Sequence, residues 1–242
     1  ALRQQPGLAP WLGNVAYAEH AERGGLLEDA IACYTQAGRE LEDRSAYAEA
    51  RLVLERALLL CEQVHRPDRQ DTLRLSAMAE LGPVLTASEG PSSLPARKLY
   101  EEAVGLARRR PFDEKARWYP LYWGWWFTGT DVNGERAHAV LRELKGVDDA
   151  QVQLQARHCV WAIDFYLGKH NNCITCVEEA LPLYEPIQTR SHQFGGHDAK
   201  VCGLAHRGLS LWFRGKVSDA LSDVKAAKAL AGERKHVGSI AH

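Results

Sequence analysis

Small and apolar residues recur along the chain with the spacing of an α-helix. In each copy of one pattern, a small residue is followed four positions later by an apolar residue and three positions after that, in all but one copy, by alanine. Positions separated by four and seven residues share one helix face, where small side chains let a neighbouring helix approach closely. The five clearest copies are Ala30-Tyr34-Ala37, Ala50-Leu54-Ala57, Ala96-Tyr100-Ala103, Cys173-Val177-Ala180 and Ala220-Val224-Ala227. A degraded sixth copy, Ala137-Leu141-Leu144, ends in leucine.

Turn residues precede these copies at a constant distance. Four copies have one five positions upstream, namely Gly25, Ser45, Gly168 and Gly215. Glycine adopts the left-handed conformation that ends one helix and lets the next begin, so each copy belongs to the second helix of a pair. Before the last copy, Leu204, Gly208 and Leu211 complete the spacing of a tetratricopeptide repeat. Ala18 and Gly38 are small residues at the position equivalent to Gly208.

The spacing predicts helices throughout and no strands, because no segment alternates apolar and polar residues. We expect helices near 11–23, 27–43, 47–64, 69–87, 93–110, 115–129, 133–145, 149–168, 171–184, 198–214 and 217–231. Successive copies lie 20, 46, 41, 36 and 47 residues apart, whereas the regular period is about 34. The interval of 20 makes the helix near 27–43 a member of two pairs. The predicted fold is all-α: a right-handed tetratricopeptide-like superhelix (an α-solenoid) of about five to six degenerate helix pairs, forming one domain over residues 1–242.

Composition and charge narrow the class of partner. The chain is 45% hydrophobic and 25% charged, as ordinary globular proteins are. Its 30 basic and 31 acidic side chains leave a net charge of -1, so no global field attracts nucleic acid or an anionic membrane. No stretch approaches the roughly 18 to 20 apolar residues that a membrane span needs. We therefore expect a cytoplasmic protein with no nucleic-acid or membrane partner.

The cysteines predict a reducing compartment, and the ends of the sequence predict a part of a longer protein. Six cysteines, at positions 33, 61, 159, 173, 176 and 202, are scattered over the expected helices. Disulfide frameworks belong to small secreted domains, so we expect reduced thiols. The sequence begins without Met and without an apolar signal-peptide core. We expect it to be an excised part of a longer multidomain protein.

Common catalytic motifs do not occur in the sequence. It contains no Gly-x4-Gly-Lys-Ser/Thr, Gly-x-Gly-x-x-Gly, His-Glu-x-x-His or Gly-x-Ser-x-Gly. Neighbouring glutamates such as Glu101 and Glu102 diverge by about 100° around a helix, so they cannot act as a carboxylate pair. We expect no catalytic residue and no cofactor.

Cys173-Ile174-Thr175-Cys176 is one candidate for chemistry. A Cys-x-x-Cys at a helix start can form a redox pair whose first thiol is acidified by the helix N-terminus. That motif expects a preceding strand, whereas here a helix ends at Gly168. Cys173 also occupies the small position of the repeat, which explains it as a packing residue. A zinc site would need a second ligand pair, for which only the scattered Cys159, His170 and Cys202 are available.

The loop before the last helix pair is a second candidate. His192, His197 and Asp198 lie within seven residues, and such side chains can ligate a metal ion or act as acid and base. The alternative is structural: Gly195 and Gly196 form a turn, and Asp198 caps the following helix.

Aromatic residues are concentrated on the helix expected at 115–129. They project around the whole helix, so most must be buried between neighbouring helices. In a solenoid the first helix of each pair lines the concave face, where aromatic side chains suit an apolar or helical peptide. The residues predicted to line such a groove are Tyr122, Trp126, His158, Phe165 and Trp212.

Several segments also carry a family resemblance. They include Ala16-Tyr17-Ala18-Glu19-His20-Ala21-Glu22, Arg44-Ser45-Ala46-Tyr47-Ala48-Glu49-Ala50, Arg190-Ser191-His192-Gln193-Phe194 and Leu209-Ser210-Leu211-Trp212-Phe213-Arg214-Gly215. This series resembles the C-terminal tetratricopeptide-like repeats of large bacterial signalling ATPases of the STAND type. In that family a nucleotide-binding ATPase module precedes the repeats, often headed by an adenylate or guanylate cyclase domain or a winged-helix domain. The resemblance spans nearly the whole chain, and it departs at 198–200, where the family pattern has a proline after the aspartate.

Three functions follow from these observations. The first is a non-catalytic interaction and regulatory module of a bacterial signalling protein, which binds its own ATPase and effector domains or a partner protein or peptide. The second is a sensor of a small ligand or peptide in the aromatic groove. The third is a metal-dependent or hydrolytic activity around His192, His197 and Asp198.

Overall fold

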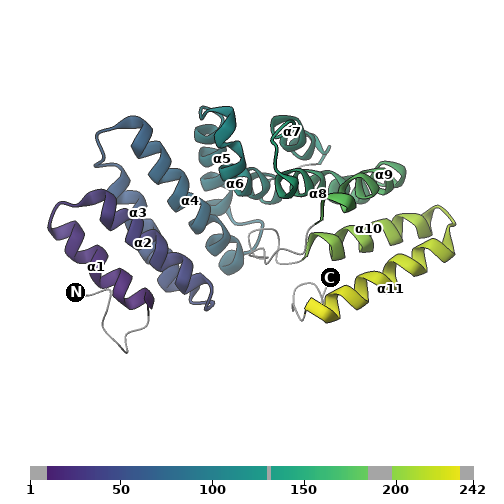
Figure 1. Ribbon diagram of the computed structural model, residues 1–242, viewed down its shortest axis with the longest axis horizontal. Helices are drawn as coiled ribbons and strands as arrows, with labels where there is room; N and C mark the ends of the chain where they lie inside the picture. Colours follow the sequence, from purple (N-terminus) through teal and green to yellow (C-terminus); the bar gives the residue numbers. More distant parts are fainter. Residues whose placement is uncertain (1–9, 130–131, 185–197, 235–242) are drawn as a thin grey trace. The chain divides into compact units, whose positions relative to one another are not determined.

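Helices form all the regular structure in the part of the chain that can be described. The computed structural model describes residues 10–129, 132–184 and 198–234 (Figure 1). In these ranges it contains eleven α-helices and two short 3-10 helices, so the expected all-α class is confirmed there. None of the described helices combines the length and apolar character needed to cross a lipid bilayer.

The helices begin and end within a few residues of the expected positions. The first five are α1 (Pro10–Arg23), α2 (Leu27–Glu42), α3 (Tyr47–Cys61), α4 (Pro67–Glu89) and α5 (Leu94–Ala107). The other six are α6 (Lys115–Phe127), α7 (Glu135–Glu143), α8 (Ala150–Tyr166), α9 (His170–Ala180), α10 (Ala199–Phe213) and α11 (Val217–Arg234). The 3-10 helices η2 (Phe112–Glu114) and η3 (Leu181–Leu183) precede α6 and follow α9. Apolar spacing together with the turn residues therefore located the α-helices of the described ranges.

The chain divides into two compact units. The N-terminal unit is Ala1–Arg110 and the C-terminal unit is Pro111–His242. The boundary falls between α5 and η2. Compactness does not decide whether the two units unfold together, so a single cooperative domain over residues 1–242 stays a prediction.

The predicted turn residues adopt the conformation that the repeat requires. The φ angles of Gly25, Gly168 and Gly215 are 73°, 71° and 74°. Ser45 holds the same position with φ of 60°, which is uncommon for a residue with a side chain. In each case the next helix begins two residues later, so one left-handed residue reverses the chain between paired helices.

The small positions of the repeat are packed against neighbouring helices. In all six copies the first and last residues are buried. A methyl group added at Gly38 would lie 2.4 Å from Cγ of Leu54, and one added at Gly82 would lie 2.4 Å from Cζ of Tyr100. Leu54 and Tyr100 are the middle residues of their copies. They therefore rest on bare backbone of the preceding helix, which is why glycine stands there.

Consecutive helices pack side by side in the N-terminal unit, and α2 also packs against a helix that does not adjoin it in sequence. It contacts α1, α3 and α4. Its Ala30, Tyr34 and Ala37 are buried, while Gly38 on the same helix receives Leu54 of α3. α2 thus serves two successive copies of the pattern, as the short interval predicts.

α8 is the centre of the C-terminal unit. It contacts α6, α7, α9 and α10, whereas α11 packs on α10 (Figure 1). The buried core around it includes Leu154, Trp161, Cys173, Val177 and Cys202. These residues come from α8, α9 and α10, so three helices share one core.

Candidate functional site

Two of the five residues expected in a groove are buried. Tyr122 and His158 have 0% and 1% of their surface exposed, so neither lines an open groove. α6 packs against both α7 and α8, which covers Tyr122. The His158 ring lies between the rings of Trp123 and Trp161, with centroids 5.8 and 4.8 Å away. The prediction was wrong for these two because helical spacing does not reveal how many neighbours cover a helix.

The other three residues lie nearer to the surface. Trp126 and Phe165 are partly buried and pack against the same core cluster of the C-terminal unit. Trp212, near the end of α10, is 54% exposed. The structure therefore brings Trp126 and Phe165 to one cluster and leaves Trp212 available to solvent.

Exposed apolar side chains lie at the end of α8 and along the last turns of α10. Tyr166, Leu209 and Phe213 are 72%, 46% and 63% exposed, in addition to Trp212. Ring contacts connect the two helix ends: Phe165 meets Tyr166 at 5.4 Å and His170 at 5.9 Å, and His170 stacks on Phe213 at 4.8 Å. We call Phe165, Tyr166, His170, Leu209, Trp212 and Phe213 the aromatic surface.

The repeat turns position the aromatic surface. α8 ends at Tyr166, the left-handed Gly168 follows, and α9 begins at His170. The turn is closed by a backbone hydrogen bond of 2.8 Å from the Lys169 N–H to the Asp164 carbonyl. His170 is held in place by a contact of 3.3 Å between its Nδ1 and the hydroxyl of the buried Ser210. The geometry that reverses the chain therefore also fixes the central ring of the surface.

One edge of the aromatic surface is cationic. Beside His170 lies a hollow of about 260 Å³ lined by Gly168, Lys169, His170, Asn171, Asn172 and Arg214. Its charged lining residues, Lys169 and Arg214, are both basic. A partner segment that carries apolar and acidic side chains would match this surface in chemistry.

A thiol lies between two histidines beneath the aromatic surface. Sγ of Cys202 is 3.2 Å from Nε2 of His158 and 3.2 Å from Nδ1 of His206. Nδ1 of His158 faces the Gln155 side-chain oxygen at 3.0 Å, so it carries the proton and Nε2 accepts from the thiol. Burial raises the pKa of Cys202 to about 12. Cys202 is therefore a protonated packing residue, and its partner His158 lies 44 positions away, where no sequence pattern points to it.

The Cys173–Cys176 pair does not have the acidified thiol that redox chemistry needs. Cys173 is fully buried in the core, as its position in the repeat predicts. Burial raises the pKa of both thiols, to about 12 for Cys176. Desolvation is the largest cause of both shifts, because burial disfavours the charged thiolate. None of the six cysteines, all of which lie in the described ranges, forms a disulfide.

Only part of the loop that contains His192, His197 and Asp198 lies within the described residues. His192 and His197 lie outside the described residues. Asp198 caps α10, because its Oδ1 accepts from the backbone N–H groups of Lys200 at 2.9 Å and Val201 at 3.1 Å. The Tyr184 hydroxyl donates to its other oxygen at 2.8 Å. The capping interpretation of Asp198 is confirmed. Within the described ranges, no group of three or more His, Cys, Asp or Glu side chains is placed to hold a metal ion.

Comparison with known proteins adds one relative. No protein-family model matches the chain. It is 44% identical, over 246 aligned positions, to an uncharacterized protein of Rhizobium meliloti (strain 1021). The alignment covers 100% of this chain and 24% of that protein. The chain thus spans about a quarter of the length of the curated relative that it matches.

Proposed function

We propose that this chain is a non-catalytic, tetratricopeptide-like interaction and regulatory module that binds a segment of protein. The observation that carries the proposal is the aromatic surface, where Tyr166, Trp212 and Phe213 are each more than half exposed. Large apolar side chains gathered on one surface mark an interaction site more often than scattered ones do. Tyrosine and tryptophan are also enriched among the residues that dominate binding energies.

The finer fold that we propose is a right-handed superhelix of helix pairs. Three features support it within each unit: consecutive helices pack together, left-handed residues stand before the second helix of several pairs, and glycines receive the middle residue of the copies at Leu54, Tyr100 and Val224. In such an array each helix pair buries its apolar face against the next pair, so a binding surface is formed by side chains from several helices.

The context that we propose is the regulatory end of a bacterial signalling ATPase in the cytoplasm. The family resemblance of the sequence supports this, as does a relative more than four times as long as the stretch that matches. The occupant of the aromatic surface would then be a segment of the ATPase or effector domains of the same protein. Its side chains would be apolar with acidic residues toward Lys169 and Arg214.

A binding experiment tests the proposal. The chain is titrated with the separately expressed ATPase and effector portion of its full-length protein, and the dissociation constant is measured. Because exposed aromatic anchors often contribute about 2 kcal/mol or more, Trp212→Ala and Phe213→Ala should each weaken binding tenfold or more. Leu52→Ala, at a 67% exposed leucine on α3, is the matched control and should leave affinity unchanged.

Three outcomes would contradict this function. One is a full-length gene without ATPase or effector domains. Another is equal loss of affinity in the Leu52 control, which would indicate non-specific adhesion. The third is a saturable change of tryptophan fluorescence with a small molecule and no binding of any protein segment, which would favour a small-ligand sensor.

A further inference from the structure

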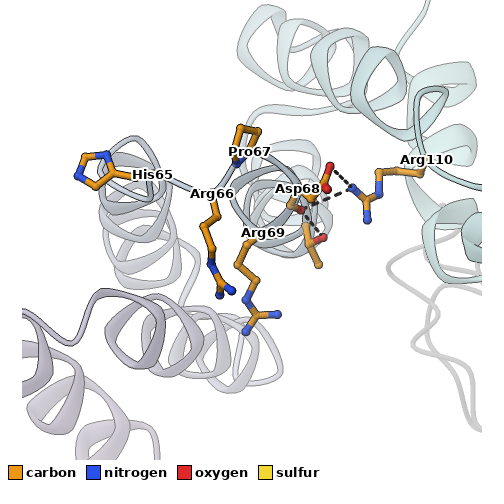
Figure 2. Close-up of a pocket in the computed structure, with 7 residues that line it drawn as sticks. His65, Arg66, Pro67, Asp68, Arg69 and Arg110 are labelled. Atoms are coloured by element: carbon orange, nitrogen blue, oxygen red, sulfur yellow. Dashed lines mark hydrogen bonds and ion pairs between the residues drawn. The ribbon is translucent and has the colours of Figure 1, made fainter.

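A second hollow lies in the N-terminal unit, where the chain passes from α3 to α4 (Figure 2). Its volume is about 460 Å³. It is lined by His65, Arg66, Pro67, Asp68, Arg69, Thr72 and Arg110. The volume falls in the range of small-molecule sites, about 300–1,000 Å³. The lining is dominated by basic groups, in contrast to the aromatic surface of the other unit.

Two arginines of this hollow already bind one carboxylate between them. Nη2 of Arg66 donates to one oxygen of Glu28 at 3.0 Å, and Nε of Arg69 donates to the other at 2.7 Å. In Figure 2 the two side chains extend in the same direction from the start of α4. These guanidiniums lower the pKa of Glu28. The pair is therefore spaced to bind an anion that offers two oxygens.

A third arginine completes the basic wall. Arg110, just after α5, reaches back to Asp68, with Nη1 3.5 Å from the backbone carbonyl and 3.9 Å from Oδ1 (Figure 2). Its side chain is only 14% exposed, whereas the Asp68 side chain is fully exposed. Packing and the backbone contact thus hold Arg110 at the hollow, while Asp68 is free to turn toward solvent.

The charges favour a doubly charged ligand. Two guanidiniums, those of Arg66 and Arg69, face the single carboxylate of Glu28, so this set is positive even with His65 neutral. An anion that displaced Glu28 would meet two uncompensated positive charges, which match a phosphate dianion. Arginine also fits phosphate oxygens with its planar set of donors, so it is the residue most suited to this group.

The start of α4 adds to the same preference. Arg66 is the N-cap residue and makes no side-chain cap hydrogen bond, and Pro67 occupies the first turn. The positive end of the 23-residue helix dipole therefore points at the hollow without a side-chain acceptor.

We propose that this hollow binds a phosphate monoester, held by Arg66, Arg69 and Arg110, and that Glu28 is the internal anion which the ligand displaces. The lining offers no aromatic platform for a base or other ring apart from His65. Recognition therefore rests on the phosphate group, whether it belongs to a small phosphorylated molecule or to a phosphorylated side chain.

Calorimetric titration of the 242-residue chain tests the site. The probes are AMP, a phosphoserine peptide, the same peptide unphosphorylated, and inorganic phosphate. Arg69→Ala and Arg66→Ala should each weaken binding of the monoesters about tenfold, since each removes one arm of the clamp. Glu28→Gln should strengthen binding severalfold, because the competing carboxylate is gone. All three residues are at the surface, and circular dichroism checks that the variants remain folded.

A neighbouring arginine provides the matched control. Arg109 pairs with Asp71 at 3.5 Å and carries the same charge, but it does not line the hollow. Arg109→Ala should change affinity less than threefold. An equal loss in this control would overturn the proposal, because it would show diffuse attraction of anions. Weaker binding by Glu28→Gln, or an adventitious ion only (inorganic phosphate bound, the monoesters not), would overturn it as well.

The two sources of the phosphate group separate in the same titrations. Similar affinities for AMP and the phosphoserine peptide would support recognition of the phosphate alone. Tight binding of one and not the other would support the site and identify the source. No saturable binding of either monoester would refute it.

Discussion

One helix pair of the C-terminal unit has a large residue at the central contact of the repeat, where the first two copies of the N-terminal unit have small ones. In the N-terminal unit the position twelve residues before each of the first two copies is Ala18 or Gly38, and Gly38 receives Leu54 directly. In the C-terminal unit the pair α8–α9 has Trp161 at that position. Trp161 is fully buried, and it reaches α10, where a methyl group added at Gly203 would lie 3.6 Å from its ring. A small residue joins two helices, whereas this tryptophan joins three.

The surfaces of the two units also differ in the kinds of side chain that they carry. The N-terminal unit carries arginine–glutamate pairs on its surface, such as Arg51–Glu55 and Arg69–Glu28. The C-terminal unit exposes Tyr166, Trp212 and Phe213. We propose that the N-terminal unit binds a charged group and that the C-terminal unit binds an apolar segment. The following changes are ordered from the largest expected effect to the smallest.

Trp161→Ala should be the most damaging single change. It removes the side chain on which α8, α9 and α10 converge, and loss of a buried tryptophan costs about 3–5 kcal/mol. Chemical denaturation measures the free energy of unfolding. Trp212→Ala removes the same side chain from an exposed site and should cost less than about 0.5 kcal/mol. Similar costs for the two variants would mean that Trp161 does not join three helices.

Gly38→Ala tests the regular contact in the other unit. The new methyl group would lie 2.4 Å from Cγ of the buried Leu54, so overpacking should cost about 1–3 kcal/mol. Gly105→Ala is the matched control in α5, because nothing lies within 4 Å of the added carbon. That control should gain about 0.5–1 kcal/mol, since alanine favours a helix interior. A neutral Gly38→Ala would show that the glycine is not required for the approach of α3.

Asp223→Asn compares a buried ion pair with an exposed one. Arg207 donates to both oxygens of Asp223 at 2.7 Å, and the aspartate side chain is 10% exposed. Asparagine keeps one oxygen acceptor, so weakening this charge-assisted pair between α10 and α11 should cost about 1–2 kcal/mol. Glu55→Gln removes an exposed partner of Arg51 in the N-terminal unit and should stay within about 0.5 kcal/mol. Thermal unfolding of the two variants measures both costs. A larger cost for Glu55→Gln than for Asp223→Asn would contradict the greater contribution of the buried ion pair.

Ser45→Gly should have the smallest effect, and it should be favourable. Ser45 has φ of 60° where the other three turns have glycine, so glycine relieves strain of about 0.5–1 kcal/mol. The reciprocal change Gly25→Ser should cost a similar amount, because its added Cβ would meet nothing within 4 Å and only the backbone opposes it. A destabilised Ser45→Gly would mean that the serine side chain contributes more than its strain costs.

Much of the fold was predictable because its rules are local. The left-handed turns at Gly25 and Gly168 and the buried small positions follow from spacing along one or two helices. The buried places of Tyr122 and His158 were not predictable, since they depend on how many helices surround α6 and α8. The contact of His158 with Cys202 bridges 44 residues and leaves no local pattern.

Two of the six residues of the aromatic surface were predicted, and two of the others had a signal in the sequence. Phe165 and Trp212 were expected, whereas Tyr166 and Phe213 were not. Each pair of neighbouring aromatic residues stands three and two positions before a turn glycine, Gly168 or Gly215. Because the last helical turn before such a glycine packs on one side only, a repeated aromatic pair there indicates a surface. The basic hollow had no such signal, since Glu28, Arg66 and Arg110 are distant in sequence and meet only in the fold.

The shared helix α2 also limits where this protein can be truncated or joined to another protein. Tandem arrays usually gain or lose whole helix pairs, because each pair contacts only the neighbouring pairs. Here α2 completes the pair with α1, seats Leu54 of α3 and contacts α4. No cut between Pro10 and Glu89 leaves all of these interfaces intact. The first four helices therefore form a single indivisible block, and chimaeras or truncations of this protein should be joined outside it.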